Sequence, residues 1–219
     1  MFFANHHYPT REAFLAAVAE AMRDEYRAIT DAGITLQLDC PDLAAGRHTL
    51  FSSMTLEEFR REAALNVEAL NHAVQDIPAE RLRLHVCWGN YDGPHDHDVP
   101  LRDIVDVVLR AKPAGISLEA ANPRHGHEWR VWDDVPLPDG RYLIPGVVES
   151  TNNFVEHAEL VAERLLRYAR VVGSERVVAG SDCGFATVAG MGAVVPSVAW
   201  SKLASLVEGA RIASVELGR

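Results

Sequence analysis

The chain has 219 residues, of which 48% are hydrophobic and 24% are charged, with a formal net charge of −10 at pH 7. This composition is typical of an ordinary soluble globular protein that can bury one substantial core. It excludes a transmembrane helix, because no run of about 18 apolar residues occurs, and the acidic balance argues against a nucleic-acid partner, whose binding depends on Lys and Arg.

Strands and helices are expected to alternate along the chain. Thr10 is a suitable N-cap for a helix that should reach about Ala32 and end at Gly33. Thr55 and Glu58 form a capping box ahead of a second helix. Alternating or continuous apolar runs predict five strands, at residues 34–39, 82–87, 115–119, 143–148 and 177–182. The helix after Thr55 should reach about residue 74, further helices are expected at about 100–111, 155–172 and 196–217, and a long loop at 122–140.

This alternation is the pattern of parallel βαβ units and predicts an α/β fold. Strand ends that carry polar residues and long loops are typical of a (β/α)8 TIM barrel, but only about five βα units are present where a closed barrel needs eight. We therefore expect a single partial-barrel domain over residues 1–219. The first strand, residues 34–39, would then have an open edge, and we expect an oligomer, or a partner chain, to cover it unless the chain is a fragment.

A candidate metal site lies at the ends of these strands. His85 and Cys87 are two residues apart on one strand, so their side chains point to the same face. An imidazole beside a thiolate suits Zn2+, which accepts mixed nitrogen and sulfur ligands. Glu119 and Cys183 end or follow two later strands, and the four residues make one plausible ligand set.

The cysteine count bears on the compartment. Three cysteines, Cys40, Cys87 and Cys183, are an odd and low number that does not describe a disulfide scaffold. Residues 1–7 lack the pattern of a signal peptide. Together these features indicate a reducing, cytoplasmic location. Cys40 lacks a nearby partner ligand and is expected to be a buried apolar residue.

Three motifs in this order resemble the C-terminal catalytic barrel of cobalamin-independent methionine synthase. They are His85-Val86-Cys87, Ser117-Leu118-Glu119 and Asp182-Cys183-Gly184. The chain looks most like the shorter single-barrel relatives, which include epoxyalkane:coenzyme M transferase, with its five strands matching strands four to eight of the family barrel. Family members carry a further N-terminal portion with the first three strands.

The resemblance implies that His85, Cys87, Glu119 and Cys183 bind zinc, and that zinc activates a substrate thiol for methylation or alkylation. Homocysteine or a related thiol would be the acceptor, and Glu119, as the hardest ligand, would be the most exchangeable. The family's Asp-Glu-Pro, whose Asp helps to hold the homocysteine amino group, appears here as Asp39-Cys40-Pro41.

Substrate contacts are expected from four residues that end or follow strands on the functional face: Asp39, Asn122, Glu149 and Asp182. Asp39 and Asp182 are also suited to be helix N-caps or acceptors of loop hydrogen bonds, and Glu149 is equally ambiguous. Thr151 stands where the methionine synthases carry a histidine thought to protonate the folate leaving group. This departure weakens the case for methyltetrahydrofolate as the donor.

Other interpretations remain open. A zinc hydrolase would keep three protein ligands and an open position for water, and an incomplete chain would use the ligands only for structure. The run His95-Asp96-His97-Asp98 could be a second metal site, although such loops are more often only solvated. The loop with His125, His127, Glu128, Trp129 and Trp132 could cover a substrate or simply anchor itself on the barrel rim.

Overall fold

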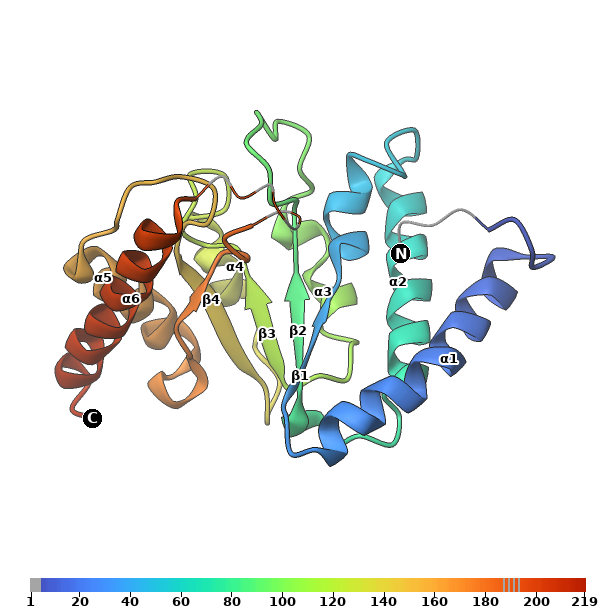
Figure 1. Ribbon diagram of the computed structural model, residues 1–219, viewed down its shortest axis with the longest axis horizontal. Coiled ribbons are helices and arrows are strands. Elements are labelled where there is room, and N and C mark those ends of the chain that lie inside the picture. The colour runs from blue at the N-terminus through green and yellow to red at the C-terminus, as the bar shows by residue number, and fades with distance from the viewer. Residues whose placement is uncertain (1–4, 187, 189, 191, 193) are drawn as a thin grey trace. The chain divides into compact units, whose positions relative to one another are not determined.

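The computed structural model describes residues 5–186, 188, 190, 192 and 194–219. Residues 1–4, which contribute to the expectation that a signal peptide is absent, lie outside the described part. The chain falls into two compact units: residues up to Trp88 with His97–Gly115, and Gly89–Asp96 with Ile116–Arg219. Figure 1 shows the alternating helices and strands that make the fold α/β, as expected.

The first unit contains α1 (Arg11–Asp31), β1 (Leu36–Asp39), α2 (Leu56–Ala73), β2 (Leu82–Val86) and α3 (Val105–Val108). Both long helices begin where the sequence predicts. The Thr10 hydroxyl accepts a hydrogen bond from the Ala13 amide at 3.1 Å, and Thr55 and Glu58 form the complete capping box. Gly33, with a φ of +86°, follows α1 in the left-handed conformation that favours glycine.

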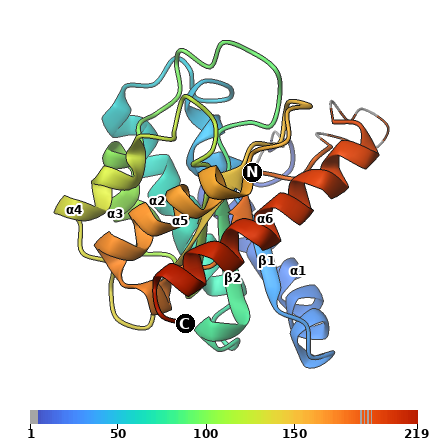
Figure 2. The same ribbon diagram turned by 90° about the vertical axis from the view of Figure 1, so that its left-hand side faces the viewer.

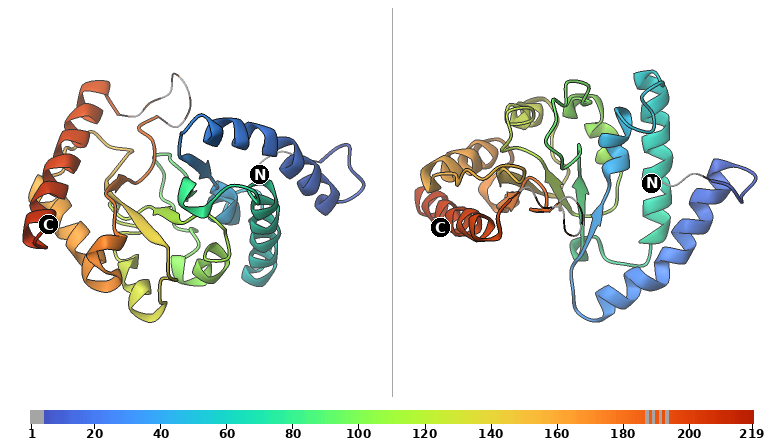
Figure 3. Two further views of the ribbon diagram at one scale, coloured as in Figure 1. Left: turned by 90° about the horizontal axis from the view of Figure 1, so that it is seen from below. Right: turned by 45° about the horizontal axis from the view of Figure 1, so that its top comes forward.

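β1 and β2 form the parallel pair that positions the first half of the candidate site. Leu36 lies opposite Leu82 and Asp39 lies opposite His85. The inward side chains of both strands are buried, and the ring of Phe59 on α2 is completely buried in this unit. α1 and α2 pack against each other beside β1 (Figure 3).

The second unit contains β3 (Gly115–Leu118), whose Gly115 belongs to the first unit, α4 (Val131–Asp134), β4 (Tyr142–Val148), α5 (Ala158–Val172), β5 (Gly180–Ser181) and α6 (Pro196–Glu216). β4 and β5 pair in parallel, with a register irregularity between Gly146 and Val148. α5 and α6 lie side by side (Figure 2) and share an apolar core with the end of β4.

Three details differ from the sequence-based expectation. The helix expected at 100–111 is replaced by a 3-10 turn, Leu101–Asp103, and the single turn of α3. The two are separated by Ile104, whose φ of −128° and ψ of −10° are not those of a helix. The expected loop 122–140 contains a 3-10 turn and α4. β5 is only two residues long, and Val177 makes an isolated bridge to Leu143. The 3-10 turns are Pro41–Leu43, Ala45–Arg47, Ala79–Arg81, Leu101–Asp103, Glu128–Arg130 and Ser174–Arg176.

Candidate metal centre

His85 and Cys87 lie at the carboxyl end of β2, and both are buried. The backbone around them is fixed by the segment that follows β1. The Cys40 amide donates to the carbonyl of His85 at 2.9 Å, and the Ala45 amide donates to the carbonyl of Cys87 at 3.0 Å. Because strand residues two apart share a face, the imidazole and the thiol are presented on the same side of β2.

Asp39 ends β1 directly opposite His85. Partial desolvation raises the pKa of the Asp39 carboxyl above its ordinary value, the Cys87 thiol acts in the same direction, and His85 acts in the opposite one. Cys40, the next residue, is buried away from water, and burial raises the pKa of its thiol well above the ordinary range. Cys40 is therefore a neutral apolar residue at neutral pH, in agreement with the sequence-based interpretation.

Glu119 and Cys183 meet in the second unit. Glu119 directly follows β3 and Cys183 lies two residues after β5, and both are buried. The Cys183 Sγ atom lies 3.7 Å from Glu119 Oε1. Sulfur and oxygen ligands of one tetrahedral zinc ion are expected about 3.6 Å apart, from the usual bond lengths. The spacing of this pair therefore fits zinc ligation.

The loop after β3 is held by Asp182, the residue before Cys183. Asp182 Oδ1 accepts hydrogen bonds from the amides of Ala120 and Ala121, each at 2.8 Å. Its Oδ2 accepts from the amide nitrogen and the side-chain Nδ2 of Asn122, each at 2.9 Å. Burial raises the pKa of Asp182, and these hydrogen bonds act against that rise.

The carboxylate of Glu119 has two further partners. Asn122 Nδ2 donates to Glu119 Oε2 at 2.9 Å, and Arg124 Nη2 approaches the same oxygen at 3.1 Å. Sequence reasoning placed Arg124 only in a loop and gave it no role in the site. The only sequence feature that could have indicated a role for Arg124 is its position, five residues after the candidate ligand Glu119.

Glu149 follows β4 and its carboxylate is used by its own loop. Oε1 accepts from the Thr151 amide at 2.9 Å and also from the Thr151 hydroxyl, while Oε2 accepts from the Asn152 amide at 2.9 Å. The loop is tied down further by Lys202, whose fully buried ammonium group lies 3.0 Å from a carboxylate oxygen of Glu156. Thr151 stands where the resembling family has a histidine, and here its amide and hydroxyl hold the carboxylate of Glu149.

Two further histidines, His48 and His95, each have a partner inside their own unit. His48 Nδ1 lies 3.0 Å from Asp98 Oδ1 in the first unit. In the second unit His95 stacks on Tyr91, with ring centroids 4.1 Å apart. The second metal site suggested for residues 95–98 stays a hypothesis.

In the loop after Asn122, three of the five noted residues are buried. His125 and Glu128 form a buried pair at 2.8 Å, and Trp132 is buried. These positions favour the interpretation that the loop is anchored by its own side chains.

Comparisons with known proteins identify what this arrangement is similar to. A family model described as "Cobalamin-independent synthase, Catalytic domain" matches residues 5–208. A 2-hydroxypropyl-CoM lyase of Xanthobacter autotrophicus is 25% identical over 239 residues, covering 97% of this chain and 58% of the relative. A methionine synthase of Saccharolobus islandicus is 26% identical over 220 residues, covering 98% of this chain and 55% of the relative.

A solved structure is also similar. It is a B12-independent methionine synthase from Shewanella sp. W3-18-1 in complex with selenomethionine, with a TM-score of 0.74 and 20% sequence identity. The likeness covers 97% of this chain and 58% of that chain, and it confirms the partial (β/α)-barrel fold. The chain spans little more than half the length of the curated relatives it matches. Among the described residues, no helix is both long and apolar enough to cross a bilayer.

Proposed function

Because the chain belongs to the family of cobalamin-independent synthase catalytic domains, we propose that it takes part in zinc-dependent transfer of a methyl or other alkyl group to a small thiol. The relatives that are named 2-hydroxypropyl-CoM lyase and methionine synthase support this class of reaction. The single observation that carries the proposal is the 3.7 Å approach of Cys183 Sγ to Glu119 Oε1, at the ends of two strands. Homocysteine or a related thiol would be the acceptor.

Four residues would hold the zinc ion: His85, Cys87, Glu119 and Cys183. One nitrogen, two sulfurs and one oxygen form a donor set that zinc accepts readily, and all four side chains are buried. When bound, zinc would supply the deprotonation of the acceptor thiol at neutral pH. The two cysteine ligands need a reducing compartment, so a cytoplasmic location is part of the proposal.

Asp39 and Glu149 would contact the two substrates. Asp39, opposite His85 at the end of β1, would accept hydrogen bonds from an amino group of the thiol substrate. Glu149 is held by the amides of Thr151 and Asn152. A threonine that bonds to its own loop offers no acid comparable to a histidine for a folate leaving group. The proposed donor is therefore an alkyl compound other than methyltetrahydrofolate.

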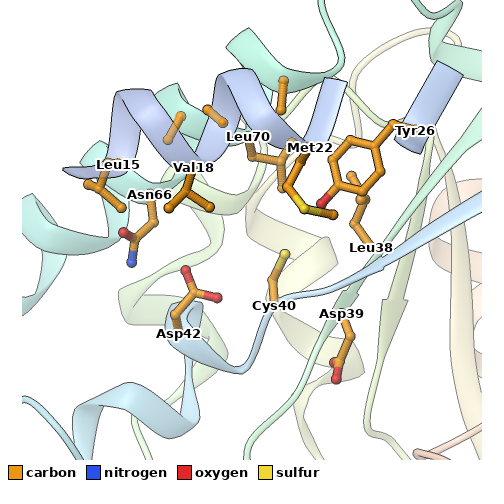
Figure 4. A pocket seen from close by; sticks show the side chains of 13 residues that line it. Leu15, Val18, Met22, Tyr26, Leu38, Asp39, Cys40, Asp42, Asn66 and Leu70 are labelled. Atoms are coloured by element: carbon orange, nitrogen blue, oxygen red, sulfur yellow. The ribbon is translucent and has the colours of Figure 1, made fainter. Parts of the chain in front are cut away.

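A partner for the first unit belongs to the same proposal. Within the described residues, β1 has a strand neighbour, β2, on one edge only. A cavity of about 280 Å³ lies between β1, α1 and α2, and its walls are mainly apolar. Figure 4 shows the Cys40 sulfur pointing toward Met22 and Tyr26 of α1. An open strand edge beside an apolar cavity supports association with further polypeptide.

The test is the metal content of the purified chain, measured by elemental analysis. The wild type is expected to hold close to one zinc ion per chain, and Cys87→Ala and Cys183→Ala are expected to lose it. Cys40→Ala is the matched control, because Cys40 is equally buried but belongs to no ligand set, and it should keep its zinc.

The outcome that contradicts the proposal is a wild-type chain with almost no zinc that reconstitution cannot restore. If zinc is present, thiol alkylation is then assayed with several alkyl donors, methyltetrahydrofolate among them. Ester or amide hydrolysis without thioether formation would favour the hydrolase interpretation.

A further inference from the structure

The carboxylate of Asp182 has no acceptor capacity left for a substrate. An ionised carboxylate offers about four lone-pair positions in its plane. Asp182 uses all four, with two amide donors on Oδ1 and two donors from Asn122 on Oδ2. The side chain is also almost completely buried, at 2% exposure. Its hydrogen bonds therefore fix the backbone that follows β3 to the residue that follows β5.

The backbone of β4 leaves Asp182 no room to move. A Cβ atom at Gly146 would lie 2.1 Å from Asp182 Oδ1 and 2.6 Å from its Cα. Only glycine fits a contact this close. The carboxylate is thus held between the glycine of one strand and the amides that follow another.

The side chain of Asn122 links Asp182 to Glu119 through hydrogen bonds. Its Nδ2 group donates one hydrogen bond to Asp182 Oδ2 and one to Glu119 Oε2, both at 2.9 Å. Its Oδ1 accepts from the amides of Arg124 and His125, each at 3.1 Å. The opposite amide orientation would point an oxygen at two carboxylates, so the surroundings fix which end of the amide is the donor.

We propose that Asn122 and Asp182 are positioning residues that hold Glu119 Oε2, so that Oε1 alone is presented on the side of Cys183 as a one-oxygen metal ligand. This inference rests on the proposed zinc site. Arg124 assists from the other side of the same oxygen. A ligand oriented in this way is ready for the metal without reorganisation, and hydrogen-bond partners of metal ligands are known to tune metal affinity.

The experiment is a double-mutant cycle on zinc affinity, measured by competition with a chromophoric chelator. Asn122→Ala should weaken zinc binding about 10- to 100-fold in the wild-type background. In the Glu119→Ala background the same change should alter affinity by less than about twofold, because its target is gone. Asn122→Asp keeps the shape but replaces the donor, and it should weaken binding at least as much as Asn122→Ala.

A second readout is the spectrum of the cobalt-substituted protein. The thiolate-to-cobalt charge-transfer band should remain in Asn122→Ala, since both cysteines are untouched, while the ligand-field bands change with the position of Glu119. Asn71→Ala is the matched control. The Asn71 side chain on α2 likewise makes two hydrogen bonds, here to the backbone of Arg110 and Lys112 in the first unit, and its loss should leave zinc affinity unchanged.

The outcomes separate the two proposals. A wild-type chain that binds no zinc overturns both the zinc site and this inference. A wild-type chain that binds zinc while Asn122→Ala binds it equally well overturns this inference alone. Equal losses from Asn122→Ala with and without Glu119 would also overturn it, since they would show a general structural role.

Discussion

At the scale of single residues, Arg60 and Asp106 show how a surface charge pair contributes to the first unit. Arg60 Nη1 and Nη2 donate to Asp106 Oδ1 and Oδ2 at 2.8 and 2.7 Å, joining α2 to α3. These two hydrogen bonds are the main cause that lowers the pKa of the Asp106 carboxyl. A carboxyl whose pKa is lower in the folded state stabilises that state above its unfolded pKa, and the contribution is lost as pH falls through the folded pKa.

We therefore expect Asp106→Asn to lower the free energy of unfolding by about 0.5 kcal/mol at pH 7, a small value because the pair is exposed to solvent. The difference should shrink as the pH falls from 7 through the folded-state pKa, which lies below the ordinary value of an aspartate, because the wild-type carboxyl then becomes protonated too. Urea unfolding over a series of pH values from 7 downward measures it. In about 1 M NaCl the difference at pH 7 should shrink, because salt screens exposed charges, and a difference that grows toward low pH would contradict the assignment.

The candidate ligands could be predicted from sequence, whereas the network behind Glu119 could not. His85 and Cys87 follow from strand periodicity, because residues two apart share a face. The bonds from Asn122 to Glu119 and Asp182 depend on the path of a loop, and loop conformation has no comparable period. For this reason the sequence suggested substrate contacts for Asn122 and Asp182, and only the hydrogen bonds point to their positioning role.

At the scale of elements, the contact between α5 and α6 depends on Gly209. A Cβ atom at this position would lie 2.3 Å from Val161 Cγ1 and 2.7 Å from the carbonyl oxygen of Ala158. The backbones of the two helices therefore approach more closely than a larger residue would allow. Because β4 shares the core of these helices, this contact also supports the strand that carries Gly146 and leads to Glu149.

Gly209→Ala is expected to lower the free energy of unfolding by about 1–3 kcal/mol, since overpacking outweighs the gain in helix propensity of about 1 kcal/mol. Thermal and denaturant unfolding measure the change. Ser201→Ala is the control on the same helix, at an exposed site whose hydroxyl bonds only to its own helix at Ser197, and it should stay within about 0.5 kcal/mol. Equal stabilities of the two variants would show that α5 and α6 can separate without cost.

The long helices were predictable because their ends carry local signals. Thr10, Thr55 and Gly33 set boundaries that the structure confirms, and Gly173 ends α5 with a φ of +95°. The segment 101–111 carries no such signal. Its burial pattern is amphipathic, with Leu101, Ile104, Val108 and Ala111 buried and Arg102, Asp106 and Arg110 exposed. The pattern therefore predicts a helix, but the backbone of Ile104, with a φ of −128°, interrupts it.

At the scale of the whole molecule, the sequence predicted an α/β partial barrel because strands and helices alternate. The fold likeness to a solved methionine synthase confirms this, and the matched relatives are close to twice as long as the part that this chain covers. Strand number alone therefore predicted the open edge at β1. The cavity beside that edge could not be predicted, because it depends on how α1 packs against α2.

The open edge of β1 has a consequence for assembly. We expect the purified chain to associate, with itself or with a chain that supplies the neighbouring strand, because β1 and the apolar cavity are otherwise exposed to water. Met22→Glu places a charge in the cavity wall and should shift the chain toward monomer in sedimentation velocity. Ala21→Glu, on the exposed side of the same helix, is the matched control and should not. The prediction would be contradicted by a wild-type chain that stays monomeric at all concentrations and still converts thiol and alkyl donor at full rate. In that case the uncovered edge of β1 would be compatible with a complete site.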